Sequence, residues 1–98
     1  MRLVGVSRLH ALACRVVELR GAARSLHAEL AAAGWANAAA AAAAYPHATQ
    51  HAGRLVITLD DAHCAVVAVN YKLGIILIEY AGGRVDMPAG RPSRGRRT

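Results

Sequence analysis

The pattern of apolar and polar positions makes the first half of the chain helical and the second half strand-like. A short segment rich in β-branched residues, 2–6 (RLVGV), predicts a strand, and Ser7 behind it is a suitable helix N-cap. Apolar residues then recur at steps of three and four. This spacing predicts an amphipathic helix that ends or bends at Gly21, since glycine weakens a helix interior. The apolar side of this helix carries Leu9, Leu12, Ala13, Val16 and Leu19.

Two further helices are expected before the pattern changes. Residues 22–33 place Leu26 and Leu30 on one side of a second helix. Seven consecutive alanines, residues 38–44, have the highest helix propensity available and predict a third, short helix. It should end before Pro46, because the residue that precedes proline avoids helical dihedral angles.

Three apolar runs in the second half predict strands that follow a polar loop, residues 47–53. A pair of aspartates separates the first two runs and suits a tight hairpin connection. The order of strand, helices and consecutive strands predicts an α+β fold, in which an N-terminal strand and helices pack on a small antiparallel β-sheet meander. The three runs are residues 54–59 (RLVITL), 65–71 (AVVAVNY) and 74–81 (GIILIEYA).

Composition fits one small domain followed by a charged tail. The 98 residues are 55% hydrophobic, with much of that share from alanine, and the formal net charge is +6. Four arginines lie in residues 91–98 (RPSRGRRT). We therefore divide the chain into a folded domain, residues 1–87, and a basic tail, residues 88–98, that is expected to be disordered. The basic balance favours a negatively charged partner such as nucleic acid, an acidic protein or a membrane surface.

Cysteines and histidines give no sign of a cofactor. Cys14 and Cys64 lie in apolar surroundings and are expected to be small buried residues rather than a disulfide. His47 and His51 have a spacing that suits a metal, but no third ligand accompanies them, so no metal site is predicted. Charged residues interrupt the N-terminal apolar pattern, and neither a signal peptide nor a membrane span is expected. A cytoplasmic protein without a small-molecule cofactor is the expectation.

Several short motifs, in this order and spacing, resemble the HigB family of type II toxin–antitoxin toxins, in the RelE-like superfamily of mRNA interferases. The resemblance covers roughly residues 1–87. It implies a compact fold of helices on a small antiparallel sheet and a cytoplasmic ribonuclease that cuts mRNA, usually on the translating ribosome. It also implies a cognate antitoxin with a helix-turn-helix domain as partner. The motifs are MRLVG at the start, Trp35 with Asn37, Tyr45-Pro46 followed by Ala48, RLVITL from Arg54, and VNYKLGIILI from Val69 followed by Gly82.

This resemblance implies that cations and a tyrosine on the sheet carry the chemistry. In a metal-free ribonuclease the ribose 2′-OH attacks the adjacent phosphate, and cations neutralise the charge that develops. Tyr71 and Lys72, at the bend between the last two strands, and Arg84 are the expected catalytic residues, with Arg84 beside the other two. The expected RNA-binding residues are Arg54 and the tail arginines Arg91, Arg94, Arg96 and Arg97.

The chain departs from this family at several positions. Members tend to carry basic residues where this chain has Cys64, Ala68 and Glu79, and a histidine and a tyrosine where it has Arg84 and Met87. A carboxylate at position 79 repels phosphate unless a neighbour neutralises it. A catalytically degenerate toxin-fold protein that only binds antitoxin or RNA is therefore the alternative function.

Two simpler interpretations also remain open. The Tyr71-Lys72 pair can be an ordinary solvated turn, and Glu79 can be an ion-paired strand residue, with Arg54 or Lys72 as its partner. If the domain is purely structural, substitutions at Tyr71, Lys72 and Arg84 should have no effect on function.

Overall fold

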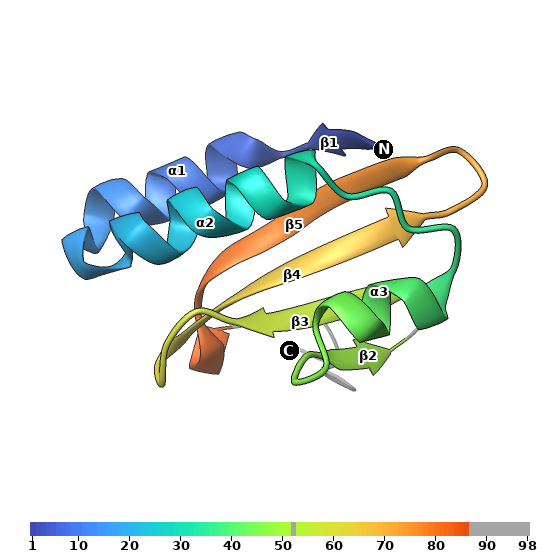
Figure 1. The fold of residues 1–98 in the computed structure, drawn as a ribbon. Coiled ribbons are helices and arrows are strands. Elements are labelled where there is room, and N and C mark those ends of the chain that lie inside the picture. Colours follow the sequence, from blue (N-terminus) through green and yellow to red (C-terminus); the bar gives the residue numbers. More distant parts are fainter. Residues whose placement is uncertain (52, 87–98) are drawn as a thin grey trace, which may run out of the picture.

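Five strands form one mixed sheet in the computed structural model, which describes residues 1–51 and 53–86 (Figure 1). The strand order across the sheet is β1-β5-β4-β3-β2. Neighbouring strands are antiparallel except at one edge, where β1 runs parallel to β5. The α+β class and the antiparallel meander of the last three strands are confirmed. The strands are β1 (Arg2–Val4), β2 (Thr49–His51), β3 (Arg54–Thr58), β4 (His63–Asn70) and β5 (Ile75–Gly83).

The α-helices cover one face of this sheet (Figure 1). Helices α1 and α2 lie over the β1–β5 side, and α3 lies over β3 and β2. The third helix ends before Pro46, as its sequence predicts, and the side chain of Asn37 accepts a hydrogen bond from the Ala40 amide at 2.9 Å to cap its start. The helical segments are α1 (Val6–Arg15), the short 3₁₀-helix η1 (Val17–Leu19), α2 (Arg20–Ala31), α3 (Ala38–Ala44) and the 3₁₀-helix η2 (Arg84–Asp86).

Alternate residues of the strands build the core between sheet and helices. Leu55 and Ile57 on β3 point toward the helices, as do Val67 on β4 and Ile76 and Ile78 on β5. Burying a side chain of this size contributes about 1.5–3 kcal/mol, so this layer dominates the stability of the domain. The helices supply Leu9, Ala23, Leu26, Leu30 and Ala41 to the same cluster.

Gly5 begins the first helix, so the prediction of Ser7 as N-cap is wrong. The helix starts at Val6, and Gly5 holds a left-handed backbone conformation with φ of 86°. The turn from β1 into α1 passes so close to β5 that a Cβ atom at this position would lie 2.5 Å from the carbonyl oxygen of Ile78. Only glycine satisfies both conditions without a shift of the backbone.

The break between the first two helices lies earlier than predicted. Helix α1 stops at Arg15, because Val16 adopts an extended conformation, and Gly21 lies in the first turn of α2 rather than at the end of the first helix. The apolar period continues through the break, so the sequence pattern does not reveal it. The bend lets α2 return along α1 and places Leu19 in the interior.

Two smaller expectations are also corrected. Cys14 is exposed, because it follows the buried Leu12 by two residues and lies about 200° further around the helix. The predicted loop 47–53 contains strand β2, whose residues Thr49–His51 pair with β3 at the edge of the sheet. A polar edge strand of three residues shows no apolar alternation, which is why the pattern does not predict it.

Candidate nucleic-acid interface

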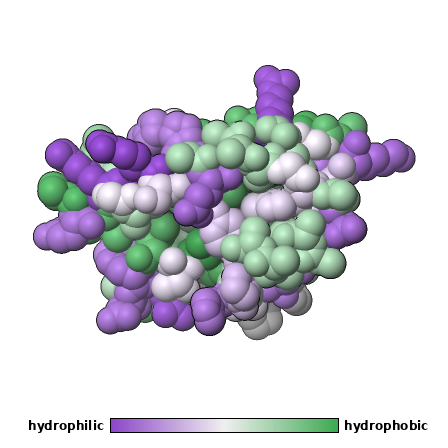
Figure 2. Space-filling model, in the orientation of Figure 1, coloured by the Kyte–Doolittle hydropathy of each residue, from purple (hydrophilic) through white to green (hydrophobic). Residues whose placement is uncertain are grey.

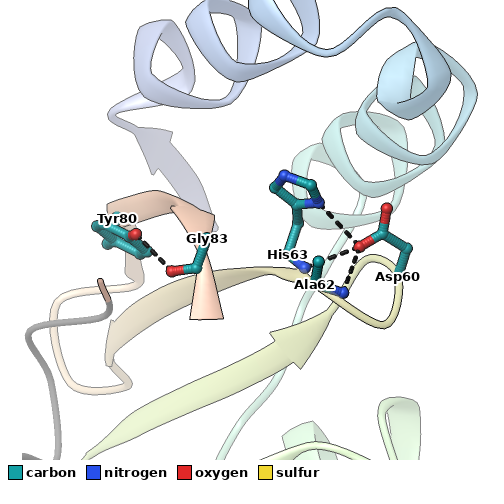
Figure 3. Close-up of polar contacts among 5 residues, drawn as sticks. All are labelled: Asp60, Ala62, His63, Tyr80 and Gly83. Carbon is teal, nitrogen blue, oxygen red and sulfur yellow. Dashed lines mark hydrogen bonds and ion pairs between the residues drawn. The ribbon is translucent and has the colours of Figure 1, made fainter. Parts of the chain in front are cut away.

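Among the described residues, the helices leave the opposite face of the sheet uncovered (Figure 1). Arg54 pairs with Ala68 and Ala68 with Leu77, so these three side chains point to this open face, away from the core. Tyr80 covers part of the open face. The Tyr80 hydroxyl donates to the carbonyl oxygen of Gly83 at 2.6 Å and would lie 2.8 Å from a Cβ at Gly82 (Figure 3). The accessible part of the open face therefore lies toward the other end of β5.

At that end, the connection between β4 and β5 forms a tight bend that we call the hairpin tip, residues 71–74. The Asn70 side chain accepts a hydrogen bond from the Leu73 amide at 2.9 Å, so Asn70 shapes the turn. Lys72 is exposed, and Tyr71 is half-buried and packs against the core cluster. The bend thus presents one free ammonium group, while the tyrosine ring is partly engaged.

Arg2 is a cation at this end that the sequence analysis missed. Its amide donates to the carbonyl oxygen of Gly74 at 2.7 Å, and Arg2 pairs with Ile75 at the start of β5. Arg2 is exposed and shares the open face with Ile75 and Asn70. The parallel pairing of the first strand with the last brings it beside the hairpin tip. That pairing joins segments about 70 residues apart and leaves no local signal in the sequence.

Glu79 and Arg54 form an ion pair across the open face. The guanidinium Nε lies 2.5 Å from Oε1, and Nη2 lies 3.3 Å from Oε2. The Arg54 side chain is 42% exposed and the Glu79 side chain is 29% exposed. Hydrogen bonding and charge attraction from Glu79 raise the pKa of Arg54 above its usual value. Of the two partners expected to neutralise Glu79, Arg54 or Lys72, the structure therefore confirms Arg54.

A β-bulge positions Glu79 for this contact. Val67 pairs with Ile78 but Val66 pairs with Tyr80, so Glu79 is an extra residue between two register pairs. The arginine partner lies two strands away, and the strand between them has only a methyl group at Ala68, the register partner of Arg54. This leaves room for the ion pair to cross β4. As a result, Arg54 brings no unpaired positive charge to the open face.

Arg84 lies at the opposite end of the sheet, so the expectation that it stands beside Tyr71 and Lys72 is wrong. Its amide donates to the carbonyl oxygen of Ala62 at 2.8 Å, and β5 runs for nine residues between the two ends. At a rise of about 3.3 Å per residue, the separation is about 25 Å. The sequence predicts a hairpin, but it does not show that residues before and after one strand lie at its two ends.

The surroundings of Arg84 differ from those of the hairpin tip. Cys64 is fully buried there, as predicted, and burial raises the pKa of its thiol while the charge of Arg84 partly opposes that rise. The tail arginines Arg91, Arg94, Arg96 and Arg97, and also Met87, lie outside the described residues.

Asp60 holds the turn between β3 and β4. One carboxylate oxygen accepts hydrogen bonds from the amides of Ala62 at 2.8 Å and His63 at 2.7 Å, and lies 2.9 Å from the imidazole Nδ1 of His63 (Figure 3). The imidazole contact, followed by the amide hydrogen bonds, holds the pKa of Asp60 below its usual value. The aspartate pair thus forms the tight hairpin connection that the sequence predicts.

The depressed pKa of Asp60 makes the stability of this hairpin depend on acid. Because the folded-state pKa lies below the unfolded one, the stabilisation is complete above about pH 4 and is lost as the pH falls through the folded value. In thermal unfolding, the Tm of Asp60→Asn should therefore lie below that of wild type at pH 6, and this difference in Tm should be smaller at pH 3. Asp61→Asn, at the exposed neighbouring carboxylate, is the matched control and should show no such narrowing.

A pocket of about 420 Å³ lies between α2, the segment after α3 and the end of β3. Apolar surface is visible in the hollow between α2 and the segment that follows α3 (Figure 2). At its rim the Tyr45 hydroxyl donates to the Glu29 carboxylate at 2.6 Å, and burial together with this contact raises the pKa of Tyr45. Trp35 packs edge-on against Tyr45 at 5.8 Å between ring centroids, and both residues pack against the core cluster.

Comparisons with known proteins add no family assignment. Of the helices in the described part of the chain, none combines the length and the apolar composition that a bilayer span requires. No group of three or more histidine, cysteine or acidic side chains among residues 1–51 and 53–86 is arranged to hold a metal ion. Protein-family models, curated proteins and solved structures were all searched, and none of them matches this chain.

Proposed function

We propose that this protein is a HigB-like toxin of a type II toxin–antitoxin pair, with a RelE-like fold, that cleaves mRNA on the ribosome in the cytoplasm. A helix-turn-helix antitoxin is its proposed partner. The observation that carries the proposal is the cationic end of the open face. There Arg2 pairs with Ile75 directly after the hairpin tip, and Lys72 and Tyr71 belong to the tip itself. The resemblance of the sequence supplies the choice of RNA as substrate.

The proposed chemistry needs neither a metal nor a cofactor. The ribose 2′-OH loses its proton to solvent and attacks the neighbouring phosphate, the bond between phosphorus and the 5′-oxygen breaks, and that oxygen takes up a proton from solvent. Fixed cations neutralise the extra negative charge on the phosphorane. In this centre Lys72 and Arg2 stabilise that charge, and the half-buried Tyr71 positions the RNA. Arg84 has no part in it, because it lies about 25 Å away.

Mapping of transcript 5′ ends after induced expression in a bacterial host tests this function. We expect new ends inside translated regions, absent from uninduced cells and suppressed when the antitoxin is expressed together with the protein. Soluble protein with an unchanged pattern of transcript ends would contradict the nuclease proposal.

The alternative, a toxin-fold protein that binds RNA or antitoxin without cutting, is favoured by one specific observation. The Arg54–Glu79 ion pair uses one of the cations on the open face and places a carboxylate where phosphate would lie. Such a protein binds RNA weakly and in a strongly salt-dependent way. It would leave transcript ends unchanged while still retaining the antitoxin on a column.

Glu79→Gln tests whether the ion pair weakens RNA binding, because the substitution removes the carboxylate and frees Arg54. We expect RNA affinity to rise about tenfold at low salt, and the slope of log K against log salt to steepen by about 0.7, the value for one added phosphate contact on a single strand. Fluorescence anisotropy with a labelled single-stranded RNA measures both. Glu18→Gln removes an exposed carboxylate from η1 and gives the protein the same net charge as Glu79→Gln. It should leave the RNA affinity and the salt slope nearly unchanged. Equal effects from the two variants would mean that Glu79 is not near the bound RNA.

A further inference from the structure

Two histidines from different helices meet on the helical side of the molecule, away from the open face. His10 lies on α1 and His27 on α2, 17 residues apart in the sequence. The Nε2 atom of His10 is 3.3 Å from the Nδ1 atom of His27, the ring centroids are 5.2 Å apart, and the ring planes are tilted by 54°. His10 is exposed and His27 half-buried, so solvent reaches the pair.

The distance between the two nitrogen atoms has a chemical meaning. The nitrogen–nitrogen distance of 3.3 Å is longer than the roughly 2.7–3.2 Å that is usual for N–H···O hydrogen bonds in proteins. Two imidazole nitrogens that each lie about 2.0–2.1 Å from one tetrahedral Zn²⁺ are about 3.3–3.4 Å apart, with ring centroids about 5 Å apart. The observed pair meets both values without a movement of either helix.

We propose that His10 and His27 form a two-histidine binding site for a divalent transition-metal ion such as Zn²⁺, Ni²⁺ or Cu²⁺, with water in the remaining coordination positions. Imidazole suits these metals, and the affinity should be highest for Cu²⁺. Because only two protein ligands meet, the site is open and exchangeable rather than a closed structural centre. The bound ion would join α1 to α2 and thereby stabilise the helical layer.

This proposal does not depend on the function of the open face. Sequence spacing does not predict this site, because the ligands come from two helices that become neighbours only in the fold. It rests on the packing of α2 back along α1, which the bend at Val16 makes possible.

Metal titration of the untagged, chelator-treated protein tests the site. We expect one Zn²⁺ ion to bind per chain in isothermal titration calorimetry. We also expect the Tm to rise by about 5 °C or more at a free Zn²⁺ concentration tenfold above the dissociation constant, since the ion binds the folded state. Co²⁺ should give visible absorption bands on binding.

Three variants decide the outcome. His10→Gln changes an exposed side chain and should fold normally, yet it should lose the calorimetric signal and the rise in Tm. His27→Gln should do the same. His47→Gln alters an exposed histidine at the rim of the pocket between α2 and α3 and should bind like wild type. Absence of binding by wild type, or equal loss in His47→Gln and His10→Gln, would overturn the proposal.

Discussion

Replacing Gly5 with alanine is expected to lower the free energy of unfolding by about 3 kcal/mol or more, a large share of the stability of a small domain. Two costs add at this position. A side chain at a φ of 86° strains the backbone, which costs about 1–3 kcal/mol. The new methyl group would also lie 2.5 Å from the carbonyl oxygen of Ile78, an atom of the sheet backbone that has little freedom to move.

Thermal and urea unfolding measure this effect, and a fall in Tm of about 12 °C or more is expected for a domain of this length. Gly74→Ala is the matched control. Its φ of 69° is also left-handed, but no atom lies within 4 Å of the added Cβ, so only the backbone strain of about 1–2 kcal/mol applies. If the two variants lose the same stability, the turn from β1 into α1 does not pass close to β5.

Loss of mRNA cleavage by about 100-fold or more is expected for the double variant Arg2→Ala/Lys72→Ala. Lys72 lies in the hairpin tip and Arg2 next to it, and removal of one group that stabilises transition-state charge commonly lowers the rate about 100-fold or more. Counting transcript 5′ ends after induction, at matched levels of soluble protein, measures the loss. The single variants should each retain part of the activity.

A control double variant, Arg15→Ala/Arg84→Ala, removes the same charge from other parts of the molecule. Arg15 ends α1, and Arg84 lies at the far end of β5. This variant should cleave nearly as well as wild type. If it loses cleavage and Arg2→Ala/Lys72→Ala does not, the reacting centre lies at the end of the sheet that carries Arg84.

Much of the fold follows from local pattern, and the departures have physical causes. Apolar runs of β-branched residues predict β3, β4 and β5, and the alanine run before Pro46 predicts α3. Propensity and proline geometry act over a few residues and need no tertiary partner. By contrast, the polar strand β2 is held by backbone pairing to β3, and the start of α1 is set by the approach of Gly5 to Ile78. Both depend on contacts with distant segments.

The candidate site divides in the same way. The sequence identifies Tyr71 and Lys72 at the bend, because the ends of two apolar runs and the residues between them are local features. It also raises Arg54 as a partner for Glu79, since an unmatched carboxylate in an apolar strand requires a nearby cation. The position of Arg2 beside the bend and the distance of Arg84 from it follow from strand order and direction, which local pattern does not determine.

The pairing of β1 with β5 also sets the order in which the protein can be completed during its synthesis. Residues Arg2–Val4 are made about 70 residues before their pairing partners Ile75–Leu77. The meander of β3, β4 and β5 can form from neighbouring segments, whereas β1 cannot pair until β5 has been made. The cationic end that joins Arg2 to the hairpin tip would therefore not exist on a nascent chain that still lacks β5. A toxin with this topology would become active only after translation had passed the segment that encodes β5.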